Sequence, residues 1–396
     1  MHWRQDLGAL ATALRAPGIR ITAGVATRGQ KDFAELYPNF DSDIASLGEA
    51  VPNLTDSEVV LRLMRLIASA HIAHNTVGIP PGMGFLTRLP LEFDWFVDGL
   101  LVTGATPEYS GLLGARVLNI GGKTPEQFLA DLAPYISYEN EQWLRAQSVN
   151  LMPANGVLRH FGMVGTDRIV HLRLEKQNGE LTDTQIPVAP ANEKKTYIRE
   201  GLHIPQALYS SHPGEWYWFR YLQDSQTIFV QYNRCANDSQ HRFGDFAHQV
   251  LAATDSNSVK RVVIDLRWNG GGDSSVINPL KNGLSSRLRR PLKVIVLIGP
   301  GTFSSALDNA ADLHKNLSAT LIGEPSGGTT EGYGEVSSVT LPNSQLVVRF
   351  TTKRWGPKRG NAAATTLTPE IPVRFKSADF IAGRDPALEA AIAARL

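Results

Sequence analysis

The chain contains 396 residues, of which 42% are hydrophobic and 19% are charged, and its formal net charge is +1. This length and composition predict a globular protein of two or three domains with a buried core. The 39 basic and 38 acidic residues nearly balance, so nucleic acid is not expected as a partner. No apolar stretch reaches the length of about 18 residues that a membrane span requires.

The first ten residues, MHWRQDLGAL, lack the charged start and apolar run of a signal peptide. The sequence therefore predicts either a cytoplasmic protein or a chain that follows a removed leader. The single cysteine, Cys235, excludes an intrachain disulfide and is expected to pack as a small apolar residue. His71 and His74 have a helical metal-ligand spacing without a third ligand nearby, and no HExxH motif occurs, so no metal or other cofactor is expected.

The predicted elements divide the chain into three regions. Residues 1–78 are expected to be mainly helical, because Asp56–His74 places Val59, Leu63, Leu66, Ile67 and Ala70 on one helical face. Asp56 or Ser57 is the expected cap of that helix. Residues 79–195 read as short strands and turns, with hairpin signals at Asp98-Gly99 and Asn178-Gly179 and a helix that starts at Thr124-Pro125.

Residues 196–396 have an α/β pattern. Three apolar strands are expected at QTIFVQYNRC, VKRVVIDLR and LKVIVLIGP, followed by a helix from Ser304, the strand ATLIGE and a closing helix capped by Asp385. Strands that alternate with helices predict parallel βα units. The aromatic stretch Gly214–Asp224 is typical of a strand that faces a core or a peptide groove.

Two adjacent serines open the helix that follows LKVIVLIGP. Ser304 and Ser305 lie after the turn Gly299-Pro300-Gly301, where a helix presents unpaired N–H groups and a partial positive charge. A serine oxygen there is suited to attack a carbonyl while N–H groups receive the oxyanion. The alternative is a helix N-cap, which serine also favours.

A second motif, Asp265–Gly272 (DLRWNGGG), lies at the predicted carboxyl end of a strand. Its glycines allow a sharp turn and close approach of a ligand, and ligands bind at this edge of parallel sheets. No Gly-Lys-Ser/Thr sequence follows, so a phosphate loop is disfavoured. A tight strand-to-helix turn is the alternative interpretation.

DLRWNGGG, TFSSA and GEPSGG, in this order, resemble the core motifs of the serine peptidase family that includes the carboxy-terminal-processing (tail-specific) proteases and the tricorn core protease. The resemblance covers roughly residues 200–396 well and the N-terminal half more loosely, through a degenerate PDZ-like stretch near Leu112–Phe128. It implies a crotonase-like α/β core over 196–396, a PDZ-like β-rich region over 79–195 and a helical N-terminal region over 1–78.

The resemblance also implies site residues. The nucleophile falls on Ser304, and the oxyanion donors on the N–H of Ser305 and of Gly271 or Gly272. The lysine base of the tail-specific enzymes is replaced by Thr329, and Lys315 is expected on the exposed side of its helix. The tricorn-like branch uses a histidine instead, which places the base at His74, with His71 one helical turn earlier as the fallback.

The tricorn branch orients its histidine network through a glutamate that falls near Ala363 here, so this acid is missing. Glu331, Glu335 and Asp308 are the candidate replacements, each also readable as a surface charge. The sequence thus predicts a serine-type peptidase acting on peptides or proteins. An inactive peptide- or ligand-binding homologue and a hydrolase of non-peptide esters or amides are the alternatives. Oligomerisation is left open, and the resemblance favours a secreted or periplasmic location.

Overall fold

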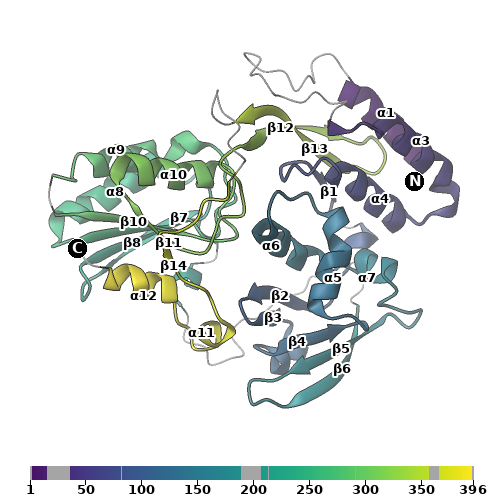
Figure 1. Ribbon diagram of the computed structural model, residues 1–396, viewed down its shortest axis with the longest axis horizontal. Helices are drawn as coiled ribbons and strands as arrows, with labels where there is room; N and C mark the ends of the chain where they lie inside the picture. The colour runs from purple at the N-terminus through teal and green to yellow at the C-terminus, as the bar shows by residue number, and fades with distance from the viewer. Residues whose placement is uncertain are drawn as a thin grey trace. The chain divides into compact units, whose positions relative to one another are not determined.

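The computed structural model describes residues 2–15, 36–81, 83–188, 207–212, 214–289, 291–355 and 365–394. The chain forms two compact units, each built from helices and strands (Figure 1). Unit 1 comprises Met1–His203 and Glu331–Ala363, and unit 2 comprises Ile204–Thr330 and Ala364–Leu396. The predicted mixture of helices and sheets is confirmed, and the three-region division made from the sequence stays a prediction.

The helical part of unit 1 contains α1 (Trp3–Arg15), α3 (Phe40–Ala50) and α4 (Asp56–Ala68). The predicted apolar face of α4 is buried at Val59, Leu63, Leu66 and Ile67. Two details of the prediction are wrong. The cap is Thr55, which exchanges side-chain and backbone hydrogen bonds with Glu58 in a capping box. The helix also ends at Ala68, so His71 lies outside it, with a positive φ of 52°.

Two sheets complete unit 1. The first has the antiparallel order β1-β13-β12, formed by β1 (Thr76–Gly78), β12 (Gly332–Thr340) and β13 (Val347–Trp355). The second is an antiparallel meander, β2-β3-β4-β5-β6, with strands β2 (Leu91–Phe96), β3 (Gly99–Ala105), β4 (Arg116–Ile120), β5 (Ile169–Glu175) and β6 (Leu181–Pro187). Both predicted hairpins are present in the second sheet.

Three helices lie between β4 and β5 in the chain: α5 (Pro125–Leu132), α6 (Glu141–Leu151) and α7 (Asn155–His160). The predicted start of α5 is confirmed, because Thr124 caps it and Pro125 occupies its first turn.

Unit 2 is built on a six-stranded sheet of order β14-β11-β10-β9-β8-β7. Its strands are β7 (Tyr217–Leu222), β8 (Thr227–Tyr232), β9 (Arg261–Asp265), β10 (Lys293–Ile298), β11 (Thr320–Gly323) and β14 (Ile371–Pro372). The five strands from β14 to β8 are parallel, and the aromatic strand β7 runs antiparallel to β8 at one edge. The predicted parallel βα units are therefore confirmed.

Helices cover both faces of this sheet (Figure 1). The helices α8 (Phe243–Ser256), α9 (Asn278–Ser285) and α10 (Ser305–Leu317) pack on one face, where their apolar side chains join Val262 and Ile264 of β9 in one core cluster. On the opposite face α12 (Pro386–Ala393) packs against Val263, and the short α11 (Ser377–Ile381) precedes it. Because successive side chains in the middle of β9 face opposite core clusters, Val262, Val263 and Ile264 are all apolar, as the sequence predicts for a strand buried on both faces.

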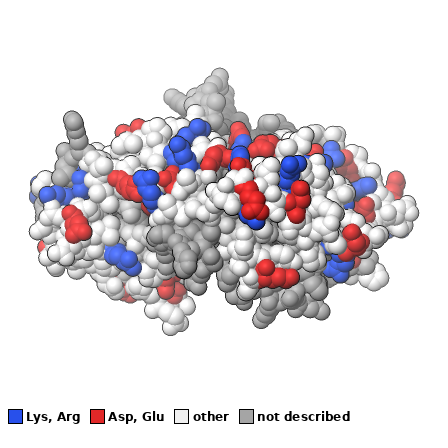
Figure 2. Space-filling view, turned by 90° about the horizontal axis from the view of Figure 1, so that it is seen from below, with Lys and Arg blue, Asp and Glu red and all other residues white. Residues whose placement is uncertain are grey.

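No helix among the described residues is long and apolar enough to span a membrane. Figure 2 shows that basic and acidic side chains are interspersed on the visible face, without a large field of one sign among the described atoms. This pattern agrees with the near-balanced composition.

Candidate functional site

The site is best described from the turn that delivers Ser304. After β10, Thr302 anchors this turn: its Oγ1 donates to the Leu266 carbonyl at 2.9 Å and accepts the Gly299 N–H at 3.0 Å. The Phe303 N–H donates to the Asn269 carbonyl at 3.1 Å. The turn is thereby joined to the segment that follows β9, so the two sequence motifs lie together at the carboxyl edge of the sheet, as predicted.

Ser304 itself adopts a strained backbone conformation, with φ 52° and ψ −130°. Its side chain makes no capping hydrogen bond, while its carbonyl accepts the N–H of Leu307 at 2.8 Å and of Asp308 at 3.1 Å. A residue other than glycine in such a region costs about 1–3 kcal/mol and is found preferentially at functional sites. A strained strand-to-helix turn is also a known way to expose a nucleophilic serine. The capping alternative therefore loses its support.

The glycine loop touches Ser304 directly. A Cβ added to Gly271 would lie 2.7 Å from Ser304 Cβ and 3.0 Å from the Ser305 nitrogen, so only glycine fits at this approach. A Cβ on Gly272 would lie 2.2 Å from the Cys235 carbonyl oxygen. Both glycines have positive φ, 101° and 137°, so the loop conformation depends on them.

The backbone donors of this loop are not equivalent. The Gly271 N–H donates to Asn269 Oδ1 at 2.9 Å, while the N–H groups of Gly272 and Ser305 find no acceptor among the described residues. The Ser305 hydroxyl donates to the Gly272 carbonyl at 2.7 Å and ties the loop to the first residue of α10. Two backbone donors next to Ser304 are thus available to an oxyanion.

Asn269 holds the glycine loop in place through hydrogen bonds, a role that the sequence did not indicate. The residue is fully buried, its Nδ2 donates to the Tyr232 carbonyl at 2.7 Å, and its Oδ1 also accepts from Cys235 Sγ at 3.5 Å. Cys235 is buried as predicted, and burial raises the pKa of its thiol to about 11, so it remains protonated at neutral pH. Asparagine is common in glycine-rich turns, so its presence there does not indicate that its side chain also holds the loop.

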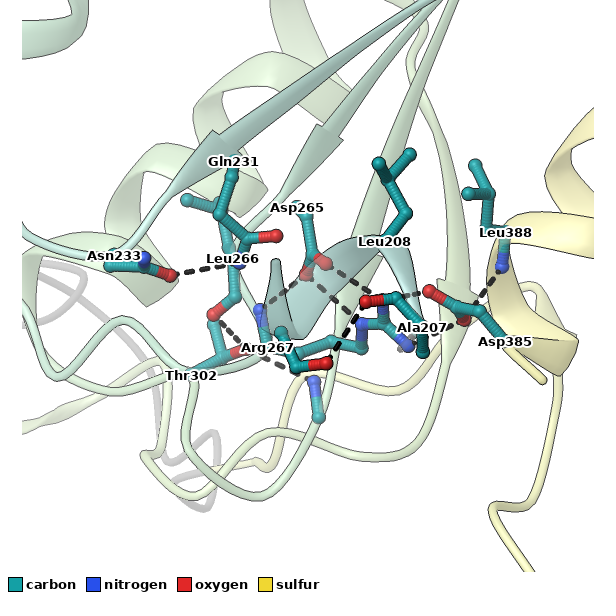
Figure 3. Close-up of polar contacts among 12 residues, drawn as sticks. Ala207, Leu208, Gln231, Asn233, Asp265, Leu266, Arg267, Thr302, Asp385 and Leu388 are labelled. Carbon is teal, nitrogen blue, oxygen red and sulfur yellow. Dashed lines mark hydrogen bonds and ion pairs between the residues drawn. The ribbon is translucent and has the colours of Figure 1, made fainter. Parts of the chain in front are cut away.

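A buried ion cluster lies at the end of β9 (Figure 3). Arg267 Nε and Nη2 donate to Asp265 at 3.0 and 2.7 Å, and Nη1 and Nη2 donate to Asp385 at 2.8 and 2.7 Å. Burial raises the pKa of the Asp265 carboxyl, and the two carboxylates raise the pKa of Arg267. Asp385 also caps α12 through Leu388 N–H at 3.0 Å, as predicted, but its bond to Arg267 has no sequence signal.

His74 belongs to unit 1. It lies in the loop between α4 and β1, and burial lowers the pKa of its imidazole to about 4. The next residue, Asn75, is buried and fixes the loop: it donates to Tyr37 Oη at 2.9 Å and accepts the Thr351 N–H at 2.9 Å. The structure thus holds His74 as a neutral imidazole, the form that a general base requires.

The candidate acids are distributed over both units. Glu331 is buried and Glu335 has a positive φ of 55°, and both belong to unit 1. Asp308 lies on the first turn of α10 in unit 2, where desolvation raises the pKa of its carboxyl. Lys315 is exposed on α10, as expected, and Ala363 falls outside the described residues. No cluster of three metal-ligating side chains occurs in the described part of the chain.

One segment of the chain matches a known peptidase family, and the fold resembles that of solved structures. Residues 278–373, which include Ser304, match the sequence model described as "Peptidase family S41". No curated protein sequence matches the chain. The structure of mature CPAF complexed with lactacystin has a TM-score of 0.66 at 13% identity, over 98% of this chain and 97% of that chain. A crystal structure of mature CPAF gives 0.64 at 13% identity, over 98% and 95%.

The photosystem II D1 C-terminal processing protease also matches, at 14% identity over 98% of this chain and 99% of that chain. Its TM-score of 0.42 is too low to show a shared fold. The likeness to CPAF shows a shared fold. The match of residues 278–373 to a peptidase family supports a serine-type peptidase activity.

Proposed function

We propose that this protein hydrolyses peptide bonds through an acyl-enzyme on Ser304, with His74 as the general base. The observation that carries the proposal is the strained Ser304 at φ 52°, held against Gly271 at the carboxyl edge of a parallel sheet. The match of residues 278–373 to Peptidase family S41 supports it. The proposal includes a crotonase-like core, a PDZ-like β-rich region and membership of the tricorn-like, histidine-using branch.

The proposed reaction has two steps. Ser304 Oγ attacks the peptide carbonyl carbon, His74 takes the hydroxyl proton, and the same proton then passes to the leaving amine as the C–N bond breaks. In the second step His74 takes a proton from water while the water oxygen attacks the acyl carbonyl carbon. The ester bond to Ser304 Oγ then breaks, and His74 returns the proton to Ser304 Oγ, which releases the acid and restores the free serine. Burial lowers the pKa of His74 to about 4, so the imidazole is neutral at neutral pH, the protonation state in which its ring nitrogen can take the hydroxyl proton.

The oxyanion is assigned to the N–H groups of Ser305 and Gly272. This choice follows from the bond between the Gly271 N–H and Asn269 Oδ1, which leaves Gly272 as the glycine donor without an acceptor among the described residues. Loss of one such donor typically costs 100- to 1000-fold in turnover, about 3–4 kcal/mol. Glu331 is the acid we assign to orient His74, because it is buried and belongs to the same unit.

The test is turnover of a mixture of internally quenched peptides, with products identified by mass spectrometry. Ser304→Ala and His74→Ala are expected to lose at least 1000-fold in kcat/KM, because nucleophile and base act as one unit. Ser285→Ala on α9 and His248→Ala on α8 are the matched controls, since both side chains are exposed and belong to helices other than the one that follows Ser304. Wild-type turnover by Ser304→Ala would overturn the proposal.

A further inference from the structure

An exposed tryptophan adjoins the glycine loop. Trp268 is 45% exposed and is one of a few large apolar side chains so exposed among the described residues. It lies between Arg267 of the ion cluster and Asn269, the support of the loop. Tryptophan and tyrosine are enriched among the residues that contribute most to binding, so an exposed indole beside the glycine loop is a candidate contact for a ligand.

The orientation of the Trp268 ring is fixed by its neighbours. Tyr209 stacks on it with ring centroids 4.5 Å apart and an interplanar angle of 17°. The Arg267 guanidinium lies 4.5 Å from the centre of the Trp268 ring and 5.3 Å from that of Tyr209. Phe375 meets Tyr209 edge-on at 6.1 Å. The stack is therefore a preformed aromatic surface, which loses little conformational entropy when a ligand binds.

The ion cluster keeps that surface rigid and limits its charge. Arg267 is only 10% exposed and is held by the carboxylates of Asp265 and Asp385 on separate hydrogen bonds. The cation against both rings is thus already paired and cannot serve as an anion-binding group. What the stack offers to a ligand is π and hydrocarbon surface, which suits an apolar or aromatic side chain.

The backbone of Trp268 is tied to the turn of the nucleophile. A Cβ on Gly301 would lie 3.3 Å from Trp268 Cα, and the next residue, Asn269, accepts the Phe303 N–H at 3.1 Å. Gly301 and Phe303 both belong to the turn that ends at Ser304. The stack is therefore anchored at the same edge of the sheet as the reacting serine and within the same unit.

We infer that Trp268, stacked on Tyr209, forms a subsite for an apolar or aromatic side chain of the substrate near the scissile bond. This inference rests on the proposed peptidase function and deepens it by naming the substrate class. Trp268 acts on selectivity and takes no part in proton transfer or oxyanion binding. Its removal should lower kcat/KM for peptides that fill the subsite and leave others unchanged.

The experiment compares matched peptides that carry Phe, Leu, Ala or Asp at each position within four residues of the cleaved bond. Wild-type enzyme is expected to prefer Phe or Leu over Ala at one of these positions by about 10- to 100-fold. Trp268→Ala should abolish that preference while the rate for the Ala peptide stays within about threefold, and Trp268→Phe should retain most of it. Leu181→Ala, which removes a side chain that is 54% exposed in unit 1, is the control and should change nothing.

A binding arm separates failure of this inference from failure of the proposed function. The Phe peptide should bind Ser304→Ala and lose at least tenfold in affinity in Ser304→Ala/Trp268→Ala, measured by calorimetry. If the wild type cleaves no peptide but this difference in affinity remains, the peptidase proposal fails and the subsite stands. An unchanged preference in Trp268→Ala overturns the subsite. The subsite is also overturned if Trp268→Ala changes the oligomeric state, measured by sedimentation, and leaves the selectivity unchanged.

Discussion

Arg267 and Asp385 lie 118 residues apart in the sequence and are joined by hydrogen bonds of 2.8 and 2.7 Å. This relationship connects the start of α12 to the residue that precedes Trp268 and the glycine loop. Since Thr302 binds the Leu266 carbonyl next to Arg267, the ion cluster, the loop and the Ser304 turn form one continuous structure.

Asp385→Ala is expected to destabilise the protein by about 3 kcal/mol, because it removes charge-assisted bonds to Arg267 and the cap of α12. Asp385→Asn preserves a capping oxygen and should cost about 1 kcal/mol less. Denaturant unfolding measures both. Glu389→Ala, which breaks an exposed pair with Arg384, should cost no more than about 1 kcal/mol. Equal costs for Asp385→Ala and Glu389→Ala would contradict a structural role for the cluster.

The strain at Ser304 predicts a conflict between stability and activity. Ser304→Gly is expected to be more stable than Ser304→Ala by about 1 kcal/mol or more, because glycine adopts φ 52° without steric cost. Both variants should be inactive. Ser318, the cap residue at the end of α10 with φ 52° and ψ 35°, is the reference, and its glycine and alanine variants should differ by a similar amount with full activity. Ser304→Gly less stable than Ser304→Ala would show that the turn is unstrained.

The glycine loop offers a matched pair of substitutions. Gly272→Ala should reduce turnover by at least 100-fold and lower stability, because φ is 137° and its Cβ would lie 2.2 Å from the Cys235 carbonyl. Gly270→Ala places its Cβ in open space, with no atom within 4 Å, and should retain activity. Steady-state kinetics measures the turnover of both variants, and thermal unfolding measures their stability. Similar behaviour of the two variants would contradict the assigned loop geometry.

The low pKa of His74 makes a prediction about pH. Its folded-state pKa, about 4, lies below the ordinary value of 6.5, so between these pH values the unfolded chain binds more protons than the folded one. Stability should therefore rise with pH across this window and fall in acid, and His74→Asn should flatten that dependence. The acid limb of kcat/KM should have its midpoint below pH 6.5 in the wild type. A midpoint above 6.5 would contradict a buried, neutral base.

Sequence patterns predicted much of the fold because its elements have local signals. The buried run around Val263, the Thr124-Pro125 helix start and the turn before Ser304 each lie within a few residues of chain. The cap at Thr55 was missed because Asp56 and Ser57 are equally good capping residues by type. The apolar periodicity continues past Ala68, where the helix ends, so the prediction that His71 lies one helical turn before His74 is wrong.

What the sequence could not show depends on contacts between distant segments. The bond of Asp385 to Arg267 and the stack of Tyr209 on Trp268 join residues with no common periodicity. The support of Gly271 by Asn269 is local, but its meaning depends on the distant turn that Asn269 also binds. The assignment of His74 rests on the resemblance, and Glu331 is a candidate replacement for the acid that the resemblance leaves missing. Both stay predictions, as does the choice of Ser304 as nucleophile.

Labelling with a fluorophosphonate serine probe, followed by peptide mass mapping, measures whether Ser304 is an activated nucleophile. We expect a single modified site at Ser304. Labelling should be absent in Ser304→Ala, at least 100-fold slower in His74→Ala and unchanged in Ser285→Ala. Well-folded protein that takes up no label, or label at another serine that is indifferent to His74, would contradict it.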